Sequence, residues 1–348
     1  WVNEGILHES EARTNLFTYS NDFTASSWQK GVTVTPNAAV SPDGTSNASR
    51  FPFGSSGYFQ ASLSRTVGQT YTVSAWVKSY DGTDEAFQLY GQNGGFSQNF
   101  VATSEWQRFS FTYTATSTAG GYGDGIGRPT TNIPADLHVY GMQLEAGSTA
   151  SSYIPTTSAT VTRAAETLTV PAANLPYDST NMSIQMDGKM TYADTGIAAE
   201  VGFTKWFFSG TNNLSSRLDT AGAETGRAYF KQEYAGTNYI VEGPADTYSP
   251  SVNVPFNIAS RHGSTFINGA VGGTALTANT TPTALPDLSS TDLELCNVFM
   301  GTIGQFRMWS DDLGDVGITE ATLPSTEPSL SLTFDGSETS FIVLDWSE

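Results

Sequence analysis

The sequence predicts an all-β protein that consists of two antiparallel β-sandwich (jelly-roll) domains in tandem. Three observations lead to this fold class. Apolar residues alternate with hydroxyl and other polar residues in many short runs, turns rich in glycine and asparagine separate these runs, and charged residues make up only 14% of the 348 residues. Coiled coils and helical arrays are excluded by this composition. Helix is expected in fewer than about a tenth of the residues.

The length predicts two domains, because domains usually contain about 100–200 residues. We expect a lead-in segment over residues 1–13, a first sandwich over 14–158, a second sandwich over 159–325 and a C-terminal strand tail over 326–348. The linker falls at about 156–166, where Ser, Thr and Ala accumulate. Each domain is large enough to bury a core without metal or disulfide support. Cys296 is the single cysteine and is expected to be a buried thiol.

Strands of the first sandwich are predicted where the alternation is clearest, at residues 32–34, 70–78, 109–113 and 137–145. Turn sequences lie between them at 41–45, 81–83, 91–95 and 120–127. Trp76 and Trp106 belong to alternating strands and are expected in the core. These short strands with regular turns are typical of a sandwich.

The second sandwich is predicted from alternating runs between Met182 and Trp309. Within RAYFKQEY, side chains two residues apart share a face of the strand. One face therefore carries Arg227, Tyr229, Lys231 and Glu233, and it is a candidate ligand surface.

Charge and motifs exclude several functions. The 15 Lys and Arg residues against 34 Asp and Glu residues give a net charge of −19, so nucleic acid is not an expected partner. No apolar run is long enough for a membrane helix, and no glycine-rich nucleotide motif occurs. The three histidines do not have zinc-site spacing, and no paired-carboxylate motif of a glycosidase occurs in 168–323. We expect neither catalysis nor an organic cofactor.

Several segments in the first half of the chain carry a resemblance to a known family. They are RTNLFTYSNDFTASSWQK at 13–30, SPDGTSNASRF at 41–51, TYTVSAWVK at 70–78, SEWQRFSFTYTAT at 104–116 and HVYGMQLEAGSTASSYIPTTSATVTRAAE at 138–166. In this order they resemble a jelly-roll module of bacteriophage and prophage tail or fibre proteins, which is similar to carbohydrate-binding modules of secreted polysaccharide-degrading enzymes. The resemblance covers residues 13–166.

The second half contains FNIASRHGSTFINGAVGG at 256–273 and IGQFRMWSDDLGDVGITEAT at 303–322. Residues 168–323 are similar, through these segments, to concanavalin A-like or laminin-G-like sandwiches. The second segment reads as a last strand followed by a short acidic turn or helix.

The two resemblances imply a fibre, spike or tail protein on the surface of a phage or phage-like particle, outside the cell, that binds host cell-surface polysaccharide for adsorption. They further imply attachment to other virion proteins through a part upstream of Trp1, and a homo-oligomer, with a trimer favoured. Two alternatives stay open: a non-catalytic structural decoration or connector of the virion, and the carbohydrate-binding part of a polysaccharide lyase or hydrolase.

Sugar binding requires aromatic rings that stack on a pyranose, together with amides, carboxylates or arginines that orient hydroxyl groups. The candidate glycan-binding residues, from two loops of the first sandwich and one face of the second, are Tyr90, Asn93, Phe96, Tyr122, Asp124, Arg128, Trp206 and Tyr229. Calcium is the metal that the acidic turns favour, because it prefers oxygen ligands. Its candidate ligands are Asp81, Asp84, Asp311 and Asp312.

Overall fold

The computed structural model describes residues 5–54, 57–92, 95–118, 123–129, 133–194, 200–324 and the backbone of 341–345. The chain forms two compact units, Ala12–Ala164 and Trp1–Glu11 with Ala165–Glu348. Residues from the N-terminal segment therefore belong to the second unit, where β1 (Ile6–Glu9) pairs with β24 (Met300–Trp309). The chain passes from the first unit to the second between Ala164 and Ala165, whereas the sequence placed the domain boundary between residues 158 and 159.

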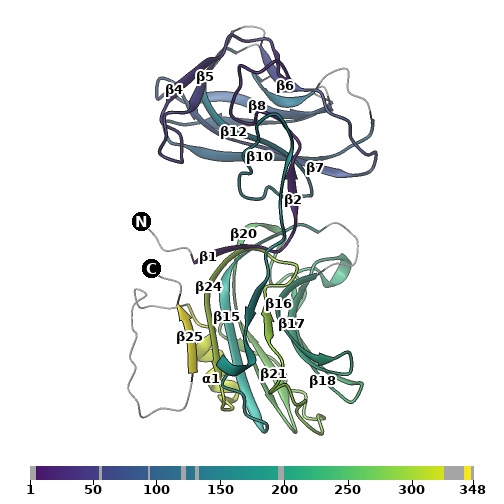
Figure 1. Ribbon diagram of the computed structural model, residues 1–348. Helices are drawn as coiled ribbons and strands as arrows, with labels where there is room; N and C mark the ends of the chain where they lie inside the picture. Colours follow the sequence, from purple (N-terminus) through teal and green to yellow (C-terminus); the bar gives the residue numbers. More distant parts are fainter. Residues whose placement is uncertain are drawn as a thin grey trace. The chain divides into compact units, whose positions relative to one another are not determined.

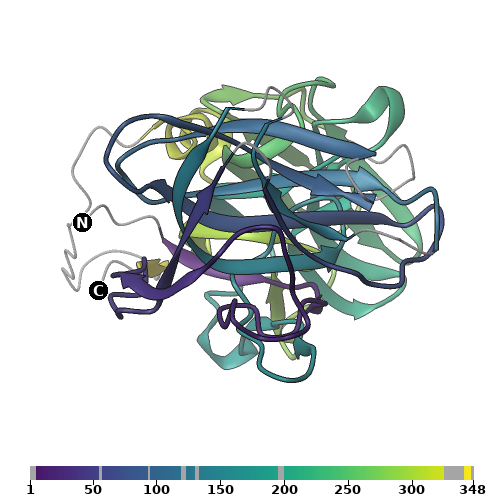
Figure 2. The same ribbon diagram turned by 90° about the horizontal axis from the view of Figure 1, so that it is seen from above.

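The first unit is an antiparallel β-sandwich of two five-stranded sheets (Figure 1). One sheet has the strand order β10-β7-β12-β5-β4, which are Gln107–Thr114, Thr70–Ser79, Ala135–Ala146, Ala48–Phe53 and Thr35–Ala39. The other has the order β3-β6-β11-β8-β9, which are Gln29–Lys30, Tyr58–Ala61, Asp124–Gly127, Glu85–Gly91 and Phe96–Ala102. A short ladder of β2 (Arg13–Asn15) and β13 (Val161–Arg163) completes the unit. In Figure 2 the long strands of this unit run roughly side by side.

The core of the first unit follows the alternation in its strands. In β7, the residues Tyr71, Val73, Ala75 and Val77 are at most 5% exposed and face the other sheet. Aromatic residues dominate the centre of this core, where Phe17, Phe23, Trp28, Phe51 and Phe59 pack against one another. The predicted sandwich is confirmed for this unit.

Two tryptophans correct the sequence analysis. Trp76 pairs in register with Arg108 and Tyr140, on the face of β7 that points away from the core. Trp106 directly precedes β10, two residues before Arg108. Both are partly exposed. The strands alternate as expected, but these two tryptophans lie on the outer face, part of which is covered by loops.

The second unit is also an antiparallel β-sandwich (Figure 1). Its larger sheet contains β1, β24, β15 (Asn181–Tyr192), β20 (Ser251–Gly263), β21 (Ile267–Val271) and β22 (Thr274–Ala275), with β25 (Phe341–Asp345) also paired to β24. The facing sheet has the order β14-β23-β16-β17-β18-β19, which are Leu168–Val170, Leu293–Leu295, Glu200–Ser209, Asn212–Asp219, Arg227–Tyr234 and Thr237–Glu242. Phe203, Trp206, Phe230, Phe299 and Phe306 lie between the two sheets.

Helical structure is sparse in the part of the chain that the structure describes. It comprises α1 (Gly314–Ala321) and two short 3-10 turns, η2 (Ala172–Asn174) and η3 (Gly222–Glu224). The helix follows the last long strand, as the sequence indicated, and it buries Ile318 against Ala259 and Ala270 of the larger sheet. Within the described residues, no helix is long and apolar enough to span a membrane. The predicted all-β class, with little helix, is confirmed.

Candidate functional site

The outer face of the β3-β6-β11-β8-β9 sheet combines tyrosines with side-chain amides. Strand pairing aligns its outward side chains in two rows. One row contains Gln29, Gln60, Gly125, Tyr90 and Ser97, and the next contains Tyr58, Gly127, Gln88 and Asn99. None of these residues is charged, although the chain carries a net charge of −19. We call these two rows the amide face.

The middle strand of the amide face, β11, presents only glycines outward. Close backbone packing explains this, because a Cβ atom on Gly125 would lie 2.0 Å from the carbonyl oxygen of Phe59. A Cβ atom on Gly123 would lie 2.0 Å from the carbonyl oxygen of Ala61. β11 therefore contributes no side chain to the centre of the amide face. The Tyr90 ring from β8 lies over this strand, with its Cε1 atom 3.3 Å from the position of a Cβ on Gly127.

A chain of hydrogen bonds orders the amides of this face. The Tyr90 hydroxyl lies 3.1 Å from Gln60 Oε1, to which it donates, and Gln60 Nε2 donates to Gln29 Oε1 at 2.8 Å. Gln29 Nε2 in turn donates to Ser62 Oγ at 3.0 Å. Burial raises the pKa of Tyr90, so its phenol stays protonated and able to donate. Because each amide has a fixed partner, its remaining donor and acceptor positions are held in place.

Tyr58 supplies the exposed ring of the amide face. Its side chain is 46% exposed. A Cβ atom at Gly31 would lie 2.7 Å from Cδ1 of this ring, so the ring packs directly over the glycine backbone. Nearby, the Gln88 Oε1 atom is buried and has no hydrogen-bond partner among the described residues, so a ligand reaches it only after the side chain turns outward. An aromatic surface beside unpaired amide oxygen is suited to a sugar, which offers both C–H groups and hydroxyl donors.

A buried ion pair fixes β11 from the core side. Asp124 and Arg65 form a salt bridge in which both side chains are fully buried. Asp124 Oδ1 also accepts hydrogen bonds from the Tyr113 hydroxyl at 2.5 Å and from the Gln92 backbone N–H at 3.2 Å. Burial raises the pKa of Asp124, against the opposing effects of Tyr113 and Arg65. These contacts connect β11 to β10 and to the residue that follows β8.

The structure corrects three of the predicted glycan contacts in the first unit. Asp124 is 0% exposed and its oxygens bind protein groups, so its role is to hold β11. Tyr90 belongs to the amide face but is only 5% exposed, so it positions Gln60. Phe96 stacks on Tyr113 with ring centroids 5.5 Å apart and packs on the core. The loops were predicted to present these rings, but the rings pack against the sandwich instead.

Arg128 directly follows the glycine strand. Its Nε atom has no hydrogen-bond partner among the described residues, and its guanidinium makes one long contact, 3.4 Å, to the Pro129 carbonyl. It therefore stays a candidate ligand residue at the end of β11. Asn93 and Tyr122, the other predicted contacts of these loops, lie outside the described residues.

In the second unit, the polar face of β18 exists as predicted, but its charges are already paired. The Arg217 guanidinium lies 4.0 Å from the centre of the Tyr229 ring and 3.2 Å from Glu200. Lys231 pairs with Glu233 at 2.5 Å, and Arg227 bridges Asp219, Glu224 and Glu242. Tyr229 is 9% exposed because Arg217 covers it. This face is a network of ion pairs and leaves little aromatic surface for a sugar.

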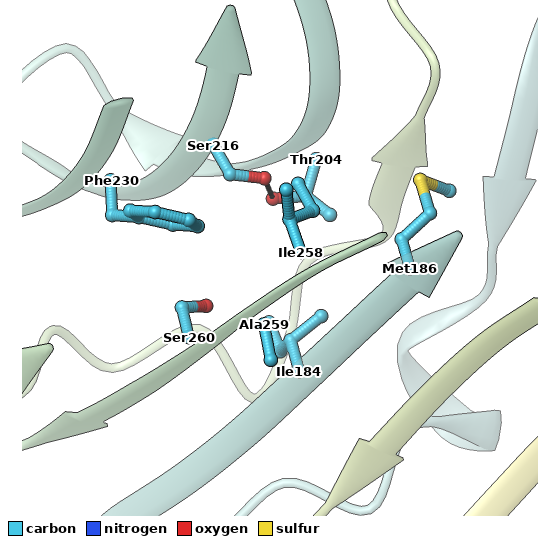
Figure 3. Close-up of a pocket in the computed structure, with 8 residues that line it drawn as sticks. All are labelled: Ile184, Met186, Thr204, Ser216, Phe230, Ile258, Ala259 and Ser260. Carbon is cyan, nitrogen blue, oxygen red and sulfur yellow. Dashed lines mark hydrogen bonds between the residues drawn. The ribbon is translucent and has the colours of Figure 1, made fainter. Parts of the chain in front are cut away.

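Trp206 lies on the opposite side of the same sheet, which corrects its assignment as a ligand residue. It is 1% exposed and donates from Nε1 to the Thr291 carbonyl at 2.8 Å. The same interior contains a cavity of about 10 Å³ (Figure 3). Thr204 and Ser216 point toward each other beside it, with their oxygens 2.7 Å apart. This volume is at the lower limit for one water molecule and excludes a larger ligand.

The predicted calcium ligands do not form a cluster. Asp81 caps its own turn by accepting from the Thr83 N–H at 2.9 Å, and Asp312 pairs with Arg261 at 2.9 Å. Asp84 and Asp311 are exposed. The described residues contain no group of three or more His, Cys, Asp or Glu side chains placed to hold a metal ion. The structure therefore gives the calcium prediction no support.

Sequence reasoning missed Tyr58, Gln29, Gln60 and Gln88. The alternation within YFQA and FQLYG does place Tyr58, Gln60 and Gln88 on the opposite side of their strands from core residues. The sequence does not reveal that β6 and β8 both flank β11, because this order depends on pairing between distant segments.

No protein-family model matches the chain, and no curated protein matches it in sequence. Among solved structures, the chain is similar to the CBM40 of a Ruminococcus gnavus IT-sialidase bound to α2,3-sialyllactose, with 12% identity over 46% of this chain and 97% of that one, at a TM-score of 0.34. It is also similar to a heptameric SAP-like pentraxin from Limulus polyphemus, with 8% identity over 48% and 81% of the two chains, at a TM-score of 0.33.

A leech intramolecular trans-sialidase is 16% identical over 41% of this chain, at a TM-score of 0.33. The chain spans only 23% of the length of that enzyme. Because all these TM-scores are low, the function proposed below rests on the residues of this chain.

Proposed function

We propose that residues 12–164 form a carbohydrate-binding module and that the amide face binds an uncharged stretch of glycan. One observation carries this proposal: a sheet face without charge, in a strongly acidic chain, presents an exposed tyrosine and ordered amides around a strand of glycines. Uncharged amides pair with sugar hydroxyls without the desolvation cost of a charged group. The two rows of the amide face contain no cation that could pair with an anionic sugar, so a neutral segment suits this surface best.

The binding test uses the full chain on an array of neutral glycans, followed by titration calorimetry with the best ligand. Tyr58→Ala should weaken binding about fivefold, because an aromatic contact of this kind contributes about 1 kcal/mol. Gln88→Ala should weaken it to a similar extent by removing the unpaired acceptor. Tyr234→Ala is the matched control, since Tyr234 is 37% exposed but belongs to the second unit. Equal affinity of the parent and the Tyr58 variant would contradict the proposal.

The proposed biological role is attachment of a phage or phage-like particle to its host, from a position on the virion surface. The resemblance of residues 13–166 to modules of phage tail and fibre proteins supports this role. Purified particles should contain the chain by mass spectrometry, and added free protein should reduce adsorption of the particles to host cells. Particles that lack the chain would refute the role on the virion while leaving sugar binding intact.

The proposed function includes no catalytic step. Prolonged incubation of the protein with the glycans that it binds should release no shorter oligosaccharides. If products appear in proportion to the protein added, the chain is instead part of a lyase or hydrolase. If no glycan binds, the alternative of a structural connector is favoured.

A further inference from the structure

The opposite face of the first sandwich carries a row of three basic side chains. Strand register places Arg50 of β5 beside His138 of β12, and His138 beside Lys78 of β7, all pointing away from the core. Tyr80 and Trp106 flank the row. We call these five residues the basic corner.

His138 forms the floor of the basic corner and has unused hydrogen-bonding capacity. Its side chain is 6% exposed, and neither ring nitrogen has a partner among the described residues. Burial, followed by the charge of Lys78, lowers the pKa of His138, so the ring is neutral near pH 7. A neutral imidazole offers one donor and one acceptor. Buried polar atoms without partners are rare, and they point to a missing ligand group or an ordered water.

Aromatic rings form the walls. The Tyr80 ring lies 5.2 Å from the His138 ring, and its side chain is 45% exposed. The guanidinium of Arg50 lies 3.7 Å from the centre of the Tyr80 ring. Trp106 donates from Nε1 to the Val40 carbonyl at 3.0 Å, which fixes its indole. The basic corner therefore presents the exposed ring of Tyr80, which His138 contacts from the sheet and Arg50 contacts on one face.

Lys78 is the cation that is available to a ligand. Arg50 is already engaged with Asp136 through two hydrogen bonds of 2.9 and 2.6 Å. Lys78 has no carboxylate partner among the described residues, and its ammonium group lies 5.2 Å from the centre of the Trp106 ring. By contrast, Lys205 and Lys231 pair with Glu294 and Glu233 at 3.2 and 2.5 Å. An unpaired cation beside an exposed ring suits an anion with an apolar face.

We propose that the basic corner is a second glycan site that binds one acidic sugar residue. The sugar carboxylate pairs with the Lys78 ammonium, the apolar face of the pyranose packs on Tyr80, and a ring hydroxyl bonds to a nitrogen of His138. This site goes beyond the amide face in both position and ligand class. The amide face and the basic corner could be occupied by one glycan that contains both neutral and acidic residues, or by two separate glycans.

The test is calorimetric titration of the full chain with uronic acid oligosaccharides containing glucuronate, galacturonate or mannuronate, and with the matching neutral oligosaccharides. Lys78→Gln should weaken uronate binding about tenfold, as expected for loss of a charge-assisted contact. Lys78→Arg should retain most of the affinity because it keeps the charge. Lys205→Gln is the matched control, because it removes one positive charge from the second unit.

Two further measurements separate this site from the amide face. Tyr58→Ala should leave uronate binding unchanged, so a failure of the amide face would not affect this result. Uronate should also shift the ring nitrogen resonances of His138 in protein labelled with ¹⁵N-histidine, a readout that needs no substitution. The proposal is overturned if no uronate oligosaccharide binds, if the Lys78→Gln variant binds as the parent does, or if the His138 resonances stay unchanged at saturation.

Discussion

The two outer faces of the first sandwich differ in what covers them. On the β10-β7-β12-β5-β4 sheet, the loop after β4 reaches over the strands, and Tyr140 donates to Asp43 at 2.7 Å. Residues after β12 cover the adjoining part, where Arg108 donates to the Ser151 carbonyl at 2.5 Å. Among the described residues, Tyr80 of the basic corner stays exposed beside these covered parts. The amide face has no comparable set of hydrogen bonds to a covering loop among its described residues.

This difference shows that outward polar residues of a sheet can find two kinds of hydrogen-bond partner. Outward polar residues of a covered face find partners in the covering loop, as Glu145 does with the Ser151 N–H at 2.9 Å. Outward polar residues of the bare face pair with one another, as Gln60 does with Gln29. Of these outward side chains Tyr58 is 46% exposed, whereas Gln60 and Tyr90 are only 3% and 5% exposed. The accessible part of the amide face among the described residues is therefore centred on the Tyr58 ring.

The largest expected effect concerns the ion pair beneath the bare face. Asp124→Ala leaves the fully buried guanidinium of Arg65 without its carboxylate. Breaking one partner of a buried pair costs about 3–5 kcal/mol, so the free energy of unfolding should fall by this amount. Denaturant unfolding of the full chain measures it. Glu105→Gln, at an exposed acid of the same unit, should change stability by less than about 0.5 kcal/mol. Equal stability of both variants would show that the ion pair does not hold β11.

A second substitution tests why the centre of the amide face is bare. Gly125→Ala places a methyl group against the Phe59 carbonyl oxygen, so β6 and β11 must separate. Overpacking of this kind costs about 1–3 kcal/mol, again measured by denaturant unfolding. Gly54→Ala is the matched control, because no atom lies within 4 Å of a Cβ at that position. If both substitutions are neutral, glycine at 125 is not required by strand packing.

The alternation of residues was sufficient to predict which side chains of one strand share a face. In β7 this prediction is confirmed by the buried side chains of Tyr71, Val73, Ala75 and Val77. In β18 the predicted polar face is formed by every second residue from Arg227 to Glu233. Alternation is a local property of an extended backbone, so it is readable without tertiary information. It does not state which face becomes the interior when both faces carry aromatic residues, and for that reason Trp76 and Trp106 were assigned to the core.

The candidate site depended on information that the sequence does not contain locally. Gln60 and Tyr90 are 30 residues apart in the chain and become neighbours only because β6 and β8 flank β11. The burial of Asp124 depends on Arg65, which lies 59 residues away. Loop composition predicted exposed aromatic and acidic residues, but long-range pairing placed these side chains inside. Pairing across the sheet, which decides such sites, must come from the structure.

The two faces also differ in their response to pH. The pKa of His138 is lowered in the folded state, chiefly by burial, so the unfolded chain binds more protons. Stability from this residue is present above about pH 6.5 and is lost as the pH falls below it, by at most about 1.4 kcal/mol per pH unit. His138→Gln should therefore reduce the stability difference between pH 7.5 and 5.5. His8 and His262 also have lowered pKa values, but they contribute equally in both proteins.

Denaturant unfolding of the parent and the His138 variant at the two pH values measures this difference. Parallel pH profiles would show that His138 does not titrate differently in the folded state. The outward residues of the amide face include no group that titrates between these pH values, so neutral glycan binding by the folded protein should stay constant over the same range.

The smallest expected change in the free energy of unfolding comes from a substitution that keeps the charge of Arg50 but removes its planar guanidinium. Arg50→Lys keeps the positive charge but loses the double hydrogen bond to Asp136 and the planar contact with Tyr80. Because the Arg50 and Asp136 side chains are 33% and 28% exposed, the ionic part is screened by solvent, and the free energy of unfolding should fall less than in the other variants. Denaturant unfolding at low and high salt tests this division. Salt screens the charge interaction but not the stacking, so a loss that persists at high salt assigns the effect to the Tyr80 contact. A loss that disappears at high salt would instead assign it to the ion pair, and Tyr80 would then be held in the basic corner without help from Arg50.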